Sequence, residues 1–323
     1  MAGLTLGGGV GWLTRAHGLS VDSLLSAEVI TAAGDLVTAS STENSELFWG
    51  LRGGGGNFGI VSTFTFQAHP LPQMVYSGTL VYGRSRWASA LRGFEAWSRD
   101  AADEVTVVIT FITPPAWMEM GEEPLMLLGF AWSDQDFDRA AQVVGELRAA
   151  APPDAESTEL TGWTAWQSAV DGLFPKGVRA YWKNTSFDRL DDDVISTIIR
   201  HGAEQTWQGT AFDIHLMGGA YGRIAEDETA FPGRSSRFWL NIYGFWDAAG
   251  DDAARTAFVR GFAKDMAPFS TGREYVNFMG LEDAGRRTSA LDVYGTAKLA
   301  RLVALKQRFD PEDLFRLNHN VEP

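Results

Sequence analysis

The sequence predicts an α+β protein in which antiparallel strands are backed by helices. Twice along the chain, two strand-like segments precede one helical segment, whereas a parallel sheet requires strand and helix to alternate one for one. The most apolar windows, such as 105–112 and 125–132, have the length of strands. They fall well short of the roughly 18 apolar residues that a membrane helix needs.

The first 70 residues are predicted to form strands and turns around two glycine clusters, 7–11 and 53–59. Strands are expected over 24–32, 36–39 and 60–66, and a helix is expected over 46–52, just before the second cluster. Prolines at 70 and 72 fit neither a helix interior nor a central strand. A domain boundary is therefore expected near Pro70.

The middle of the chain carries the repeated pattern. Strands over 105–112 and 125–132 precede a helix over 135–150, and strands over 211–217 and 237–246 precede a helix over 251–266. Residues 152–157 are expected to break the two halves, and 191–201 to form a further short helix. A helix over 297–309 closes the pattern and is ended by Asp310-Pro311.

Composition excludes several classes of function. Lys and Arg number 27 and Asp and Glu number 41, so the net charge of 27 − 41 = −14 repels nucleic acid. There is no cysteine, which excludes disulfides, thiolate metal sites and cysteine nucleophiles. Residues 1–9 lack the basic and apolar regions of a secretory signal. We expect no nucleic-acid partner, no membrane association and a cytoplasmic location.

Glycines 54–59 formally match G-x-G-x-x-G, the dinucleotide-binding pattern. That pattern requires a strand before the glycines and a helix after them, and the order predicted here is reversed. The dinucleotide fold is therefore rejected. Two interpretations of the glycines remain, namely a tight turn alone or a close approach of unhindered main chain to a ligand.

Other catalytic patterns are absent from the sequence. The five histidines show no metal-binding spacing, and neither a G-x-S-x-G elbow nor a phosphate-binding G-x-x-x-x-G-K-[ST] loop occurs. No metal site is predicted. His215 lies in an apolar strand, where a packed histidine is favoured over a catalytic one. The 12 tryptophans are assigned to the core or to pocket walls.

Three long segments carry a resemblance to a known family: Gly3–Ile30, Glu46–Val61 and Ala300–Asn320. They resemble the flavin domain of the berberine-bridge-enzyme-like FAD-linked oxidases, a group with a PCMH-type FAD-binding domain in the vanillyl-alcohol-oxidase-like superfamily. Tyr275-Val276-Asn277-Phe278 is similar to the active-site Tyr-x-Asn-Tyr/Phe motif of that family. The resemblance spans nearly the whole chain.

The resemblance implies a fold and a cofactor. Residues 1–70 and 285–323 would form a partial FAD-binding domain from both chain ends, and 71–284 would form a substrate domain with an antiparallel sheet covered by helices. FAD is the implied cofactor, with Ile30 near the adenine and Asn318 near the ring. The main chain implied to lie near the flavin belongs to Gly3, Leu4, Gly8, Gly9 and Gly11.

The implied activity is an oxidoreductase reaction that passes hydride from a substrate hydroxyl or C–H carbon to flavin N5, with dioxygen or another acceptor taking the electrons on. A sugar or secondary-metabolite hydroxyl is the expected substrate. Tyr275 is the candidate base and Lys183 a possible helper. The alternatives are a packed tyrosine at Tyr275 and a structural lysine at Lys183.

The chain also departs from the family pattern. Family members have a preceding subdomain that binds the diphosphate and supplies a flavin-linked histidine, and no equivalent stands before Gly3. Three explanations stay open: a start site upstream of Met1, a truncated gene, or a separate polypeptide that supplies this subdomain as a partner. The alternative function is a truncated, catalytically silent remnant or a noncatalytic binding protein.

Overall fold

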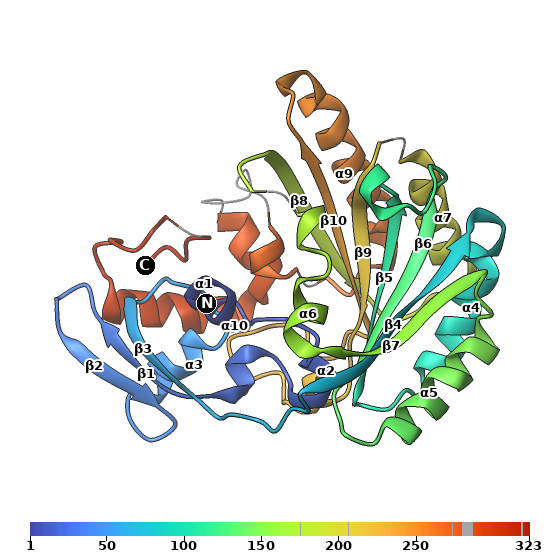
Figure 1. Ribbon diagram of the computed structural model, residues 1–323. Helices are drawn as coiled ribbons and strands as arrows, with labels where there is room; N and C mark the ends of the chain where they lie inside the picture. The colour runs from blue at the N-terminus through green and yellow to red at the C-terminus, as the bar shows by residue number, and fades with distance from the viewer. Residues whose placement is uncertain (175, 206, 273, 280–286, 318) are drawn as a thin grey trace. The chain divides into compact units, whose positions relative to one another are not determined.

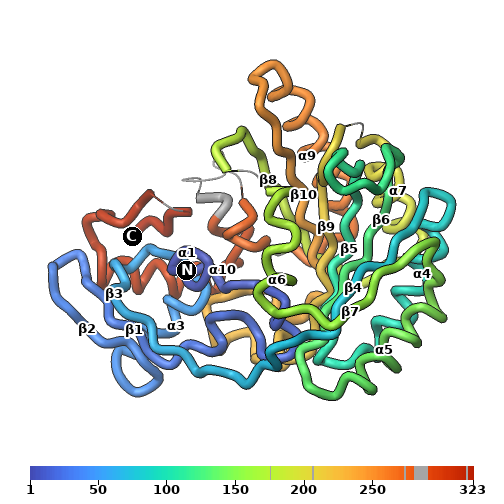
Figure 2. The backbone as a smooth tube through the Cα atoms, viewed as in Figure 1, coloured from blue at the N-terminus to red at the C-terminus, as the bar shows by residue number. Residues whose placement is uncertain are grey.

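The computed structural model describes residues 1–174, 176–205, 207–272, 274–279, 287–317 and 319–323 (Figures 1 and 2). The chain divides into two compact units. Unit 1 comprises residues 1–70, 218–236 and 271–323, and unit 2 comprises 71–217 and 237–270.

The division differs from the expected middle domain of 71–284 at two segments. Residues 218–236, and the chain from Thr271 onward, belong to unit 1. The first segment is tied there by main-chain hydrogen bonds, because Ala230 N donates to Trp49 O (3.3 Å) and Phe231 N to Arg52 O (3.0 Å). Nothing in the local sequence of 218–236 predicts these partners, which lie far away along the chain.

Unit 1 contains a three-stranded antiparallel sheet in the order β2-β1-β3 (Figure 1). Its apolar side packs against helices α3 and α10 around a core that includes Val29, Leu47 and Leu302. Helix α10 is interrupted at Gly295, where φ is 66° and ψ is 170°. The elements are α1 (Ala2–Leu6), α2 (Thr14–His17), β1 (Leu24–Ile30), β2 (Leu36–Ser40), α3 (Ser45–Leu51), β3 (Ile60–Phe66), α8 (Ala220–Arg223) and α10 (Arg287–Phe309). Two short 3₁₀ helices matter below, η1 (Ser20–Ser23) and η7 (Val276–Phe278).

Unit 2 is built on a seven-stranded sheet in the order β7-β4-β6-β5-β9-β10-β8, and every pairing in it is antiparallel. The strands are β4 (Met74–Gly83), β5 (Val105–Thr113), β6 (Leu125–Trp132), β7 (Ala155–Gly162), β8 (Arg179–Phe187), β9 (Gly209–Leu216) and β10 (Phe238–Trp246). The helices are α4 (Trp87–Ser98), α5 (Phe137–Ala150), α6 (Trp163–Ser168), α7 (Asp192–Glu204) and α9 (Asp252–Met266).

Helices α4, α5, α7 and α9 share one apolar core with alternate residues of the strands, and Figure 1 shows α4 and α5 side by side along the sheet. Leu128 and Phe130 of β6 and Ile242 of β10 are fully buried in this core. The predicted α+β architecture, with an antiparallel sheet covered by helices, is confirmed.

The expected break at 152–157 is wrong. Residues from Ala155 onward form β7, which pairs with β4 from Val81↔Ala155 to Met74↔Gly162 and continues the sheet. Strand β7 is an edge strand of polar sequence whose residues are mostly exposed, so it carries no apolar alternation that could reveal it. Strand β4 and helix α4 were likewise not predicted.

Helix packing in unit 2 makes one glycine necessary. A Cβ at Gly93 in α4 would collide with the carbonyl oxygen of Ala150 at the end of α5, whereas a Cβ at Gly145 in α5 has open space. Gly93→Ala should therefore lower the free energy of unfolding by ~1–3 kcal/mol, since the two helices must move apart. Gly145→Ala, the matched control, should raise it by ~0.5–1 kcal/mol because alanine loses less backbone entropy. Urea denaturation followed by tryptophan fluorescence measures both, and equal effects would contradict the packing argument.

Candidate functional site

The two glycine clusters of unit 1 lie against each other. Gly55 N donates to Leu6 O at 3.0 Å, which joins the second cluster to the end of α1. Phe231 explains two of the glycines. A Cβ at Gly8 would lie 2.6 Å from the Phe231 ring, and a Cβ at Gly53 would overlap the Phe231 main chain. Internal close packing, in addition to turn geometry, therefore requires glycine at these positions.

A cavity of about 580 Å³ opens where the clusters meet the C-terminal segment. This volume lies within the ~300–1,000 Å³ typical of small-molecule sites. The walls are glycine main chain and apolar side chains, joined by a few polar groups. The lining residues are Ala2, Gly3, Leu6, Gly7, Gly55, Gly56, Gly59, Ile60, Val61, Val276, Asn277, Leu314, Phe315, Arg316, Leu317 and His319.

Tyr275 precedes η7 and is buried, with 3% of its surface exposed. Its Oη accepts hydrogen bonds from Gly9 N at 3.0 Å and from Asn277 Nδ2 at 2.8 Å. Burial raises the pKa of the phenol above its ordinary value, while hydrogen bonds from Gly9, Asn277 and the main chain of Val10 act in the opposite direction. The oxygen is thus surrounded by donors that favour a negative charge on it.

Asn277 connects Tyr275 to the cavity wall. Its Nδ2 also donates to Leu4 O at 3.0 Å, and a Cβ at Gly7 would overlap the amide group of Asn277. The amide is therefore fixed between α1 and the phenol. Asn277 itself lines the cavity, so one side chain touches both the cavity and the Tyr275 oxygen.

Of the described residues implied for the cofactor, one lines the cavity and the others do not. Gly3 lines the cavity, whereas Leu4 and Gly9 are bonded to Asn277 and Tyr275 respectively. Gly11 is outside the lining, in open space. Ile30 is 41% exposed at the end of β1 and also stands outside the lining. Asn318 lies outside the described residues.

Lys183 lies in β8, on the helix-covered face of the unit 2 sheet. It is paired with Ile242 in the register of β8 and β10 and shares a sheet face with Tyr181. Helix α9 packs on that face, where Arg260 Nε donates to Tyr181 Oη at 3.2 Å. Because neighbouring residues of a strand point to opposite faces, Trp182 and Asn184 face away from α9. Lys183 therefore lies on the face that α9 covers, and its part in catalysis stays a prediction.

The face of the sheet opposite helices α4, α5, α7 and α9 is here called the second face. It carries polar groups of which the sequence analysis considered only His215. His215 Nε2 lies 2.6 Å from Asp213 Oδ1, and Asn241 stands beside Asp213 in the register. His215 is 21% exposed, so the expected packed core histidine is wrong. Tyr243 is fully buried on the same face, and burial followed by the charge of Asp213 raises its pKa. The signal in the sequence was the alternation of polar residues, such as Asp213 and His215 in β9 and Asn241 in β10, with apolar residues of the same strands.

Comparison with known proteins shows what this chain is similar to. A family described as "Berberine and berberine like" matches residues 274–322, which include Tyr275 and Asn277. The chain is 29% identical to the "Uncharacterized FAD-linked oxidoreductase YgaK" of Bacillus subtilis, over all of this chain and 70% of that protein. It is 27% identical to "Glucooligosaccharide oxidase" of Sarocladium strictum, over all of this chain and 68% of that protein.

Among solved structures, BBE-like 1 of Physcomitrella patens superposes with a TM-score of 0.83, at 22% identity, over 97% of this chain and 68% of the other. The fold and the matched relatives define the class of FAD-linked oxidoreductases. Within that class, the chain is similar to the berberine-bridge-enzyme-like proteins, in its C-terminal segment and in its fold. It spans about 70% of the length of these relatives. Among the described residues, no helix combines the length and apolar character needed to cross a bilayer.

Proposed function

We propose that this chain binds FAD in the cavity of unit 1 and oxidises a hydroxyl-bearing small molecule, with Tyr275 as the general base. The observation that carries this proposal is the Tyr275 oxygen, which receives N–H donors from Gly9 and Asn277 beside a glycine-walled cavity. Both the "Glucooligosaccharide oxidase" and the "Chitooligosaccharide oxidase" of Gibberella zeae are relatives, which supports a sugar hydroxyl as the substrate group.

The cavity fits the ring system of a flavin. Glycines at five lining positions admit a flat ring close to the main chain, and Leu6, Val61 and Leu314 supply apolar contacts. Arg316 brings a positive charge to the same wall, which suits an anionic cofactor. When bound, FAD would supply the hydride acceptor at N5.

The chain itself contributes proton transfer. A substrate hydroxyl must lose its proton as its carbon loses hydride, and an ionised Tyr275 can accept that proton. The N–H groups of Gly9, Asn277 and Val10 form a preorganised set of donors for the phenolate. Their role is to lower the cost of ionising a phenol whose burial opposes ionisation.

The second face of unit 2 is proposed to bind the substrate. Asp213 and His215 offer a carboxylate and an imidazole in contact at 2.6 Å, a pair suited to hydrogen bonds with hydroxyl groups. Trp182 and Phe174 pack near Tyr243, with ring centroids 6.0 and 5.7 Å away. Aromatic faces of this kind provide apolar surface for a ring-shaped ligand.

A paired substitution tests the cofactor site. A Cβ has open space at both Gly3 and Gly11, and both are exposed residues of unit 1, but only Gly3 lines the cavity. Gly3→Phe should weaken FAD binding by about tenfold or more, a cost of ~1.4 kcal/mol, because the ring takes cavity volume. Gly11→Phe should stay within about twofold. Quenching of FAD fluorescence on titration measures both affinities, and the reverse order would place the cofactor elsewhere.

A polypeptide partner that completes the flavin domain is also part of the proposal. Ile30 pairs with Leu36 on one side and with Ile60 on the other, so the three side chains form one apolar row. They are 41%, 63% and 59% exposed respectively, an unusual concentration for a surface sheet. Leu36→Lys should leave the chain folded by circular dichroism. It should also reduce binding of an apolar-surface dye to this row. Unchanged dye binding would contradict the assignment of the row as an exposed apolar surface that a partner covers.

A further inference from the structure

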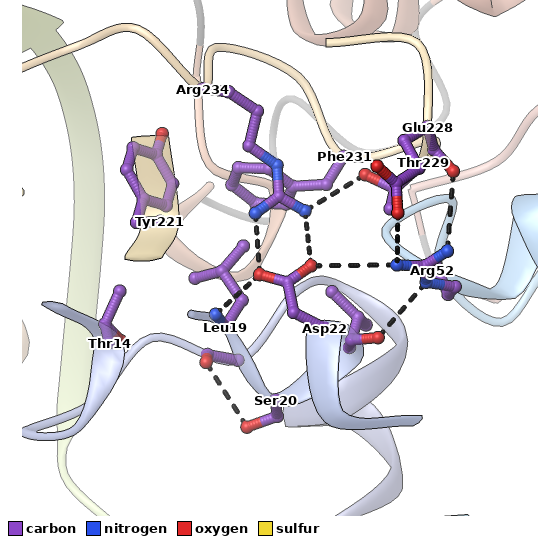
Figure 3. A network of polar contacts seen from close by, with 12 residues as sticks. Thr14, Leu19, Ser20, Asp22, Arg52, Tyr221, Glu228, Thr229, Phe231 and Arg234 are labelled. Carbon is purple, nitrogen blue, oxygen red and sulfur yellow. Dashed lines mark hydrogen bonds and ion pairs between the residues drawn. The ribbon is translucent and has the colours of Figure 1, made fainter. Parts of the chain in front are cut away.

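A buried ion pair in unit 1 joins Asp22 of η1 to Arg234 (Figure 3). We call residues 7–11, the first glycine cluster, the glycine loop. Arg234 donates from Nη1 to Asp22 Oδ2 at 2.7 Å and from Nη2 to Asp22 Oδ1 at 2.8 Å. The two side chains are 3% and 4% exposed. Arg234 Nη2 also donates to Thr229 Oγ1 at 3.0 Å, and Arg52 stands 4.0 Å from Asp22. A bidentate pair held this way fixes both direction and distance between two chain segments.

On the Asp22 side, the pair controls the glycine loop. Asp22 belongs to η1, whose first two residues, Ser20 and Val21, hold the glycine loop through their main chain. Ser20 N donates to Gly9 O at 2.9 Å and Val21 N donates to Gly8 O at 3.0 Å. Gly9 in turn presents its N–H to the Tyr275 oxygen. A displacement of η1 would therefore move the donor that contacts Tyr275.

On the Arg234 side, the pair controls an aromatic contact. The guanidinium lies 5.0 Å from the centroid of the Phe231 ring, in the same segment of unit 1. Phe231 is held by its main chain, with N donating to Arg52 O and O accepting from Lys298 Nζ. Its ring centroid is 5.9 Å from that of Tyr275. The same ion pair thus reaches Tyr275 by a second route, through packing.

We infer that the Asp22–Arg234 pair is a positioning device for Tyr275, which fixes the Gly9 N–H against the phenol oxygen and the Phe231 ring against the phenol ring. This inference rests on the proposed function, in which Tyr275 must ionise. The pair touches neither the cavity lining nor the phenol, so Asp22 and Arg234 act through other residues. Their effect must appear in the ionisation of Tyr275.

The test measures that ionisation in the chain without added cofactor. Tyrosine labelled at Cζ gives one NMR signal for each of the seven tyrosines, and Tyr275→Phe identifies the signal of Tyr275. Arg234→Lys keeps the charge but loses the bidentate contact. It should lower the ionisation constant of Tyr275 about tenfold, moving the midpoint up by about one pH unit, because a donor to the phenolate is displaced. Asp22→Asn should shift it in the same direction.

Arg301→Lys is the matched control, because Arg301 makes an equally bidentate contact with Glu46 in the same unit, at 2.8 and 2.7 Å. It should leave the Tyr275 midpoint unchanged. Thr229→Val removes one hydrogen bond from Arg234 and keeps the ion pair, so it serves if Arg234→Lys fails to fold. It should give a smaller shift in the same direction.

An unchanged Tyr275 midpoint in folded Arg234→Lys and Thr229→Val, or an equal shift in Arg301→Lys, would overturn the inference. Failure of the proposed function looks different. In that case the chain would not bind FAD, whereas the Tyr275 midpoint would still respond to Arg234. The two readouts are therefore independent.

Discussion

Replacing Tyr275 with phenylalanine should slow reduction of bound flavin by substrate about 10²–10⁴-fold, the usual cost of losing a general base. The substitution removes the oxygen that accepts from Gly9 and Asn277 and keeps the ring that packs against Phe231. Binding of FAD should change little, because Tyr275 is not in the cavity lining. Anaerobic stopped-flow absorption at the flavin band measures the reduction rate in a single turnover.

The pH dependence sharpens this expectation. Burial holds the pKa of Tyr275 above its ordinary value near ~10, so the reactive phenolate is scarce at neutral pH and increases with pH. The wild-type reduction rate should therefore rise into the alkaline range, and the rise should vanish in Tyr275→Phe. Tyr82→Phe removes a buried phenol that donates to Ala151 O in unit 2 and serves as control. An unchanged reduction rate in Tyr275→Phe would eliminate the assignment.

The second large effect concerns the ion pair between Lys306 and Asp310 in unit 1, whose side chains are both fully buried. Lys306 Nζ lies 2.6 Å from Asp310 Oδ2 and also donates to Asn57 O and Phe315 O. The two Asp310 oxygens accept from Leu314 N at 2.7 Å and Phe315 N at 2.8 Å. The pair thus fastens α10 to the C-terminal segment that lines the cavity.

Asp310→Asn should lower the free energy of unfolding by ~3–5 kcal/mol. Both carboxylate oxygens accept main-chain N–H groups, so the amide nitrogen of asparagine must face a donor. Lys306 also loses its fully buried carboxylate and keeps only Asp313 Oδ1, at 3.0 Å, as a charged partner. Glu46→Gln makes the same chemical change in an exposed pair with Arg301 and should cost less than ~1 kcal/mol. Urea denaturation compares the two variants. Equal losses in the free energy of unfolding would show that the buried pair contributes no more to stability than the exposed pair.

The same site predicts a direction for acid unfolding. Burial acts to raise the pKa of Asp310, but hydrogen bonds from Lys306, Phe315 and Leu314 outweigh it, so the pKa is lowered. A carboxyl with a lowered pKa in the folded state stabilises the fold above its unfolded pKa of ~3.9 and loses that contribution as pH falls below it. Asparagine does not titrate, so the contribution of this site to stability no longer changes with pH. Asp310→Asn should therefore lose less of its free energy of unfolding than the wild type as the pH falls from about 5 into the acid range.

Local patterns predicted the elements with strong periodicity. Strand β3 and strand β6 were predicted to the residue, and α5 within two residues at its start, because apolar alternation and helical spacing are dense there. Strand β7 was missed because its edge position leaves Glu156 and Glu159 exposed to solvent and removes the alternation. Assignment of 218–236 to unit 1 depends on long-range contacts such as Arg234 with Asp22, which no local pattern encodes.

Part of the candidate site could likewise be predicted from local sequence, and part could not. Tyr275 followed from the resemblance of its motif, but the partners that define its chemistry lie far along the chain. Gly9 is 266 residues from Tyr275, and Phe231 comes from an irregular segment. Strand alternation puts Lys183 on the helix-covered face, whereas Trp182 and Asn184 point to the second face. Asp213 was missed because its apolar neighbours in β9 hide a polar face.

The central claim is that the residues of this chain hold a flavin. The most direct measurement is the visible absorption spectrum of the purified chain, incubated with FAD and then separated from unbound cofactor. We expect the flavin bands to remain with the protein, at a ratio approaching one FAD per chain. The ratio should be clearly lower in Gly3→Phe and nearly unchanged in Gly11→Phe. A folded wild-type chain that stays colourless after incubation would contradict the account.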